Sequence, residues 1–412
     1  MIPRSLKLCD ATILDKPSSR NLMGVSRTHL RVIGFLLCLS SGIALAEERL
    51  PTHFWRQPLA PQGEAPRTWS TEERSLAPES CGGCHSDKLE EWRTSFHAKA
   101  FSPGLVGQLL TYDAGDSAAC MECHAPLAEQ RQAFEAARRR AETEPGAGHG
   151  LADAGNSCGG CHLRGHRRFG PPQRETGAVG QSDASAPHGG VMRVPEFEKS
   201  EFCAACHQFP QSQAINGKPL ENTLVEWKQS PAARSGTTCQ SCHMPERKHL
   251  WRGIHDPDMV RSGLTPEFVA EHATARFRLT STRIGHAFPT YVTPKVMMKG
   301  LALDEAGEPV PRSEVSHVIQ RQVESVDGDW IERSDTRLLP GQSAMLEIAW
   351  PKSGRVKFWL EIYPDDFYHQ HVYSNLLREL AADSAAAKLI AEADRTAQGS
   401  HFTLFETTVQ RP

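Results

Sequence analysis

The stretch CGGCHSDKLEEWRTSFHAKA, residues 81–100, opens with two cysteines and a histidine within five positions. The same C-x-x-C-H pattern recurs as CMECH at 120–124, CGGCH at 158–162, CAACH at 203–207 and CQSCH at 239–243. The five copies use ten of the twelve cysteines in the chain. Coincidence does not explain this repetition, and zinc sites do not need a histidine after every cysteine pair.

C-x-x-C-H is the attachment signal of a c-type haem. One helical turn would bring both cysteines and the histidine of a motif to the same side of the backbone. The two sulfurs would then form thioethers to the porphyrin, and the imidazole would bind the iron. The sequence therefore predicts five covalent haem c groups. The attaching cysteines would be Cys81, Cys84, Cys120, Cys123, Cys158, Cys161, Cys203, Cys206, Cys239 and Cys242, and the proximal iron ligands His85, His124, His162, His207 and His243.

The first 46 residues read as a secretory leader. HLRVIGFLLCLSSGIALA combines basic residues, an apolar run and a small-residue ending at Ala46. We predict that this leader starts at Met23, because the residues before Met23 would make its basic part too long. An uncleaved membrane anchor is the alternative, although the apolar run is short for a membrane span. Cleavage would remove Cys9 and Cys38, the two cysteines outside the motifs, as expected for an oxidising compartment.

The remaining chain divides by composition. Residues 47–80 are proline-rich and predict an extended N-terminal segment, and residues 81–264 form a pentahaem region of short helices and loops whose core is the porphyrins. From residue 265 to 412, alternating apolar residues and turn signals predict an antiparallel, sandwich-like β-domain. One helix over 374–397 and a final strand over 401–410 complete it. The expected fold class is thus α+β. The net charge of −3, with both signs mixed, gives no indication of nucleic-acid binding.

A second set of histidines could close the sixth position of each iron. Ser86–Ala100 has apolar residues at helical spacing, which predicts a helix that carries His97 toward the haem of another motif. His149 and His188 lie in glycine-rich loops, where the backbone can approach a flat ring. His249 and His255 both follow the fifth motif, and one of them is expected to be a ligand. His286, in RIGHAFPT of the β-domain, would connect the two domains if it bound a haem.

Several of these segments resemble periplasmic multihaem c-type cytochromes. The shared features are W-x-x-S-x-H after the first motif, FCAACHQ, TCQSCHMP followed by H-x5-H, and GHAFPT with a downstream D-x-R-x-L-P-G. The haem part is similar to the tetrahaem cytochrome that takes electrons from hydroxylamine oxidoreductase, and the β-domain to relatives with a C-terminal sandwich. The resemblance implies electron transfer through stacked, bis-histidine haems. It also implies distal roles for His97, His149, His188 and His286.

The main functional hypothesis is an electron carrier that is exported to the periplasm and exchanges electrons with redox proteins. No membrane span is expected after leader cleavage. A cell-surface or secreted location is the alternative to the periplasm. A reductase of a small nitrogen or sulfur compound, acting at one five-coordinate haem, is the alternative. A structural role in a homo-oligomer is a third.

Overall fold

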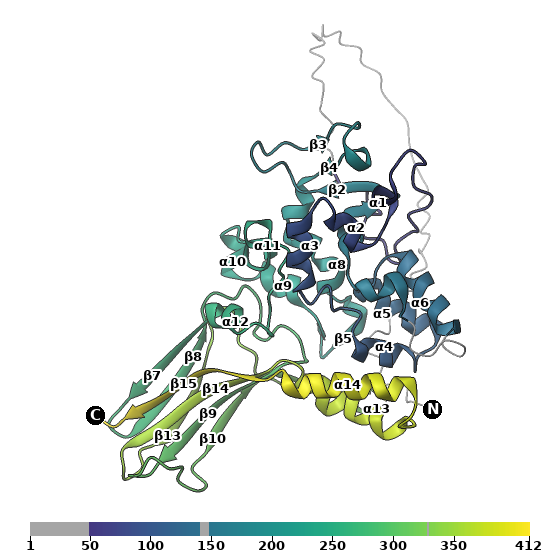
Figure 1. The fold of residues 1–412 in the computed structure, drawn as a ribbon. Coiled ribbons are helices and arrows are strands. Elements are labelled where there is room, and N and C mark those ends of the chain that lie inside the picture. The colour runs from purple at the N-terminus through teal and green to yellow at the C-terminus, as the bar shows by residue number, and fades with distance from the viewer. Residues whose placement is uncertain (1–48, 141–147, 328) are drawn as a thin grey trace, which may run out of the picture.

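The computed structural model describes residues 49–140, 148–327 and 329–412 (Figure 1). The predicted leader, with Met23, Ala46 and the cysteines at 9 and 38, lies outside the described residues. Short helices and small strands come first, a β-rich part follows, and the last helices return to the first part. This mixture of helices and several antiparallel sheets confirms the expected α+β class.

The described helices are α1 (Thr71–Arg74), α2 (Pro78–Gly82), α3 (Ser86–Arg93), α4 (Pro103–Leu109), α5 (Ala114–His124), α6 (Ala128–Arg140), α7 (Cys158–His162), α8 (Ala204–His207), α9 (Thr223–Lys228), α10 (Pro231–Arg234), α11 (Cys239–His243), α12 (Pro257–Gly263), α13 (Ser374–Glu379) and α14 (Ala385–Gly399). The strands are β1 (Leu163–Arg164), β2 (Arg167–Gly170), β3 (Gly180–Gln181), β4 (Met192–Arg193), β5 (Ala214–Ile215), β6 (Lys218–Pro219), β7 (Leu264–Ala270), β8 (Thr274–Ser281), β9 (Lys295–Leu303), β10 (Val315–Ile319), β11 (Arg321–Val326), β12 (Asp329–Asp335), β13 (Ser343–Ala349), β14 (Arg355–Tyr363) and β15 (Phe402–Gln410). None of these helices is long and apolar enough to span a membrane.

Each C-x-x-C-H motif lies on or beside a short helical turn. The helices α7 and α11 consist of the motif itself, α5 and α8 end on a motif histidine, and α2 ends inside the first motif. A capping box of Thr238 and Ser241 starts α11 and satisfies N–H groups that the helix leaves free. The cysteines and the histidine of a motif are therefore one turn apart.

The helix expected over 86–100 is shorter than the sequence pattern indicates. α3 ends at Arg93, because the hydroxyls of Thr94 and Ser95 donate to the carbonyls of Glu91 (2.8 Å) and Trp92 (2.7 Å). Such side chains compete with the backbone for helical acceptors. His97 consequently lies in the turn after the helix and not on its face, so the prediction of a helical His97 was wrong.

Two antiparallel sheets of the β-rich part share one hydrophobic core. Their strand orders are β10-β9-β14-β15 and β13-β8-β7. Every second residue of β14 is buried, and the core contains Phe358 and Leu360 of β14 together with Phe277 of β8. The two-residue period that the sequence predicts is thus present in the structure.

The C-terminal helices leave the β-rich part and cover the first part of the chain (Figure 1). α14 packs against α4, where a Cβ at Gly107 would come within 2.7 Å of the Ile390 side chain. Glycine therefore permits this close approach. The single helix expected over 374–397 is two helices, since the chain is extended at Leu380 and Ser384 caps the start of α14.

Candidate functional site

The sulfur atoms bring the five motifs together in two groups. Cys81 of the first motif lies within interaction distance of Cys158 of the third. In the fourth motif, Cys206 contacts Cys123 of the second, and Cys203 contacts Cys239 of the fifth. The fourth motif thus touches two others, which its position in the sequence does not indicate.

Nine of the ten motif cysteines carry free thiols, namely Cys81, Cys84, Cys123, Cys158, Cys161, Cys203, Cys206, Cys239 and Cys242.

Four of the five motif histidines are fixed through Nδ1. His124 contacts the carbonyl of Ala100 (2.9 Å), His162 that of Phe169 (2.7 Å) and His243 that of Arg252 (2.7 Å). A carbonyl only accepts, so Nδ1 must carry the proton and Nε2 presents a lone pair. These three imidazoles are therefore held in the tautomer that a metal ligand needs.

His207 differs from these three in its acceptor. Its Nδ1 lies 2.7 Å from a carboxylate oxygen of Glu221. The charge of Glu221 raises the pKa of His207 to about 9. Glu221 was not found from the sequence, since no spacing rule connects it to the motif.

Three motif histidines face a second imidazole. The ring centres are 6.2 Å apart for His97 and His207, and 6.2 Å apart for His162 and His249. A metal bound between two imidazoles, with bonds of about 2 Å, would set the ring centres about 6 Å apart. The spacing of these two pairs therefore fits an iron between them.

The third pair connects the two parts of the chain. His243 of α11 and His286 of the loop between β8 and β9 are 6.3 Å apart and nearly parallel, with an interplanar angle of 12°. Burial lowers the pKa of His286 to about 4. Burial and neighbouring imidazoles likewise lower the pKa of His97 to about 3 and that of His249 to about 4. All three stay neutral at pH 7, as a metal ligand must.

The other three predicted distal histidines differ in their surroundings. His188 lies close enough to His85 for the two charges to interact, and its backbone N–H donates to Glu73 (2.6 Å). His149 packs between Phe101 and Phe134 and contacts Asp153 through Nδ1 at 2.9 Å. Among the described residues, no motif histidine makes a ring contact with His149.

Among the described residues, His255 makes no ring contact with a motif histidine. Its Nε2 lies 2.9 Å from Asp365, and its ring stacks on Phe96 at 4.1 Å. The two candidates after the fifth motif therefore have different partners, since His249 faces a motif imidazole and His255 a carboxylate.

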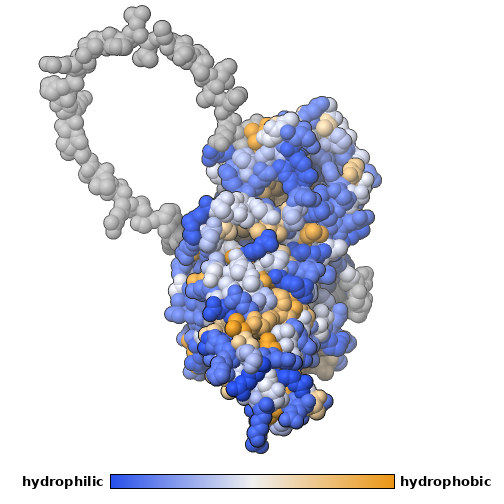
Figure 2. All heavy atoms as spheres, turned by 90° about the vertical axis from the view of Figure 1, so that its left-hand side faces the viewer, coloured by the Kyte–Doolittle hydropathy of each residue, from blue (hydrophilic) through white to orange (hydrophobic). Residues whose placement is uncertain are grey.

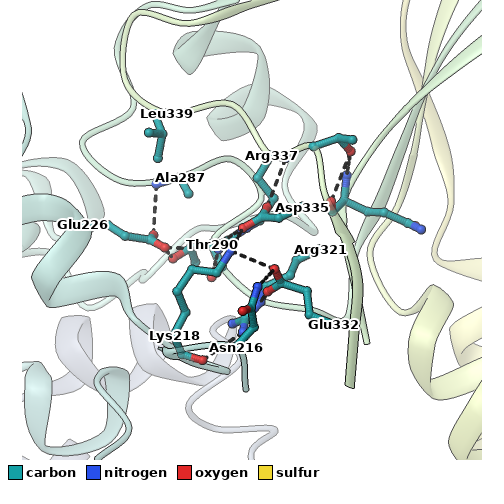
Figure 3. Close-up of polar contacts among 12 residues, drawn as sticks. Asn216, Lys218, Glu226, Ala287, Thr290, Arg321, Glu332, Asp335, Arg337 and Leu339 are labelled. Carbon is teal, nitrogen blue, oxygen red and sulfur yellow. Dashed lines mark hydrogen bonds and ion pairs between the residues drawn. The ribbon is translucent and has the colours of Figure 1, made fainter. Parts of the chain in front are cut away.

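A buried polar network holds the loop that carries His286 (Figure 3). Glu226 of α9 accepts from the backbone N–H of Ala287 (3.1 Å) and from Arg337 (3.1 Å). Arg337 also contacts Asp335 and the carbonyl of Thr290. Both ends of the Glu226–Arg337 pair are almost fully buried, so the pair is screened little by solvent.

A second part of the same network joins the β5–β6 hairpin to β11 and β12. Arg321 is fully buried, pairs with Glu332 (2.8 Å) and donates to the carbonyls of the hairpin. Lys218 of the hairpin reaches Glu332 (3.1 Å) from the other side. The β-rich part is thus fixed against the motif part by charge as well as by apolar contact.

Figure 2 shows apolar patches within a mostly hydrophilic face. Large apolar side chains that remain exposed in the motif part include Phe96 (50 %) after α3 and Val225 (40 %) on α9. Apolar surface of this kind suits contact with a flat, hydrophobic group.

Comparison with known proteins agrees with the motif content. The family model described as cytochrome c554 and c-prime matches residues 80–163, which contain the first three motifs. A search among curated proteins found no match. Together with the motifs, the family match supports a multihaem c-type cytochrome.

One solved structure shares the fold. The crystal structure of a penta-heme cytochrome c552 from Thermochromatium tepidum is similar with a TM-score of 0.56 at 20% sequence identity. The match covers 82% of this chain and 99% of that chain. The likeness therefore extends beyond the segment that the family model matches.

Proposed function

We propose that this protein carries electrons through five covalently bound haem c groups, most of them closed by two histidines. The observation that carries the proposal is the set of three imidazole pairs with ring centres 6.2 or 6.3 Å apart. Haem iron would supply one-electron chemistry, with a potential set by its axial ligands and surroundings. The chain would hold the rings, fix the imidazole tautomers and exclude water.

The proposed ligand pairs follow from these contacts. The pairs are His207 with His97, His162 with His249, His243 with His286, and His85 with His188. By elimination, His149 would serve His124. His249 is preferred to His255 because the Nε2 of His255 is already bound to Asp365.

The sulfur contacts support an order for the electron path. The first and third motifs would form one haem pair, and the fourth would stand between the second and the fifth. The electrostatic influence of Cys161 on Cys203 and Cys206 supports a third motif that lies near the fourth as well. The fourth motif would then be the junction of the path.

The remaining parts of the proposal concern the setting of the protein. Residues 1–46 would direct export to the periplasm, where haem is attached covalently. The β-rich part would act as a sandwich-like domain that supplies His286 as a ligand. Redox proteins would be the electron donor and acceptor. The resemblance to the tetrahaem partner of hydroxylamine oxidoreductase favours a protein donor over a small-molecule donor.

The test is the visible spectrum of the dithionite-reduced protein before and after addition of carbon monoxide, with a pyridine haemochrome count on the same sample. We expect five haems per chain and no spectral change with carbon monoxide. Fewer than five haems would contradict the attachment sites. A shift of the Soret band would contradict full closure of the irons.

A reductase acting at one open iron is the second candidate. The second motif favours this candidate, because its His124 makes no ring contact with another imidazole in the described part of the chain. His149 instead contacts Asp153. If carbon monoxide binds, a His149→Ala variant would leave the spectral shift unchanged under the reductase hypothesis, since that iron would already be open.

A further inference from the structure

Glu221 is the one carboxylate among the acceptors found for the motif histidines of the described chain. The Nδ1 groups of His124, His162 and His243 are bound to neutral backbone carbonyls. His207 is bound to the charged Glu221 at 2.7 Å, and the Glu221 side chain is 15% exposed. A carboxylate acceptor draws the Nδ1 proton away more strongly and makes the imidazole a more electron-rich ligand.

Within the described ranges, the only ion-pair contact of Glu221 is with His207. An imidazole that binds iron is neutral, so in the haem-loaded protein His207 would leave the charge of Glu221 uncancelled. A negative charge in this mostly buried position favours the more positive oxidation state of a nearby iron, because screening by water is weak there.

We propose that Glu221 makes the haem of the fourth motif the hardest of the five to reduce, and so sets an energetic step at the junction of the electron path. This inference rests on the proposed function, because it requires that His207 bind a haem iron. The junction follows from the contacts of Cys206 with Cys123 and of Cys203 with Cys239. An electron that moves between the haems of the second and the fifth motif would then have to pass through the low-potential haem of the fourth. This would slow electron exchange between those two haems.

The decisive variant is Glu221→Gln in the full haem-loaded protein. Glutamine keeps an oxygen acceptor at nearly the same place and removes the charge. In a spectroelectrochemical titration, we expect the reductive step of lowest potential to move to higher potential, and the other steps to move less. An unchanged lowest step in a variant with its full haem content would overturn the inference.

The matched control is Asp394→Asn. Asp394 also lies 2.7 Å from the Nδ1 of a histidine, His369, which does not belong to a C-x-x-C-H motif. This substitution removes a carboxylate–imidazole pair of the same length, and we expect all reductive steps to stay where they are. An equal shift in Asp394→Asn would mean that the effect is general charge removal, which would also overturn the inference.

A measurement on the unmodified protein keeps the inference testable if Glu221→Gln does not fold. Near-infrared magnetic circular dichroism of the oxidised protein separates neutral histidine ligands from those with imidazolate character. We expect one haem whose histidine ligand has imidazolate character, and neutral histidine ligands at the others. Neutral ligands at all haems would overturn the inference. The haem count and the carbon monoxide test examine the proposed function and do not depend on Glu221. A failure of the proposed function can therefore be told apart from a failure of this inference.

Discussion

The motif part and the β-rich part of this chain are stable for different reasons. The β-rich part buries an extensive apolar core between two sheets, with alternating residues turned inward. The motif part consists of short helices and loops, and its main apolar cluster is confined to the region of α4, α5 and α6. Short helices gain little stability on their own. The difference teaches that one region carries its core in its side chains, while the other would complete its core with a cofactor.

The largest expected effect comes from removing the cofactor. A chain produced without haem attachment should lose the structure of residues 81–260 and keep that of the two sheets. Limited proteolysis with mass spectrometry would then give a resistant fragment that begins near Leu264, whereas the haem-loaded chain would resist throughout. Equal digestion of both regions in the haem-free chain would contradict the comparison.

A substitution in the sheet core should affect the other region less. Phe358→Ala removes a fully buried ring and should lower the free energy of unfolding of the β-rich part by about 3–5 kcal/mol. Denaturant unfolding followed by far-UV circular dichroism measures this, and the haem spectrum reports on the motif part. Val269→Ala, at a side chain that is 43% exposed, is the control and should cost about 0.5 kcal/mol or less. Loss of the haem spectrum at the same denaturant concentration would mean that the regions unfold as one.

The contact between the two regions should be weaker than either core. Arg337→Met leaves Glu226 buried without its cation, which should cost roughly 3 kcal/mol. The double variant Glu226→Gln with Arg337→Met should recover part of this loss, because no unpaired charge then remains buried. The comparison of single and double variants by denaturant unfolding checks this. Additive losses would mean that the pair is not coupled.

The smallest effect should be the response to acid. Contacts with Arg337 and Lys218 outweigh burial and lower the pKa of Asp335, and contacts with Asn216, Arg321 and Lys218 do the same for Glu332. A lowered carboxyl pKa stabilises the fold above the unfolded value, so this contribution is lost as the pH falls below about 4. Stability measured from pH 6 to pH 2 should fall less steeply in Asp335→Asn than in the unmodified chain. Identical slopes would exclude a role for Asp335.

The sequence predicted the local features well where a short pattern has one physical meaning. The C-x-x-C-H motifs lie on helical turns, and the alternating segments after residue 264 are strands. The pattern failed where a few hydroxyls decide the outcome. Thr94 and Ser95 end α3 early, and the capping of α14 by Ser384 divides the expected C-terminal helix.

The sequence by itself predicted which residues attach haem, because two thiols and an imidazole one turn apart need only local geometry. It also predicted a short list of histidines as distal ligands. Only the tertiary structure decided which imidazoles face each other, that His255 is bound to Asp365, and that Glu221 reaches His207. These pairings join residues from different elements and, for His243 and His286, from different regions. Their distances depend on how the whole chain packs, and no spacing in the sequence encodes them.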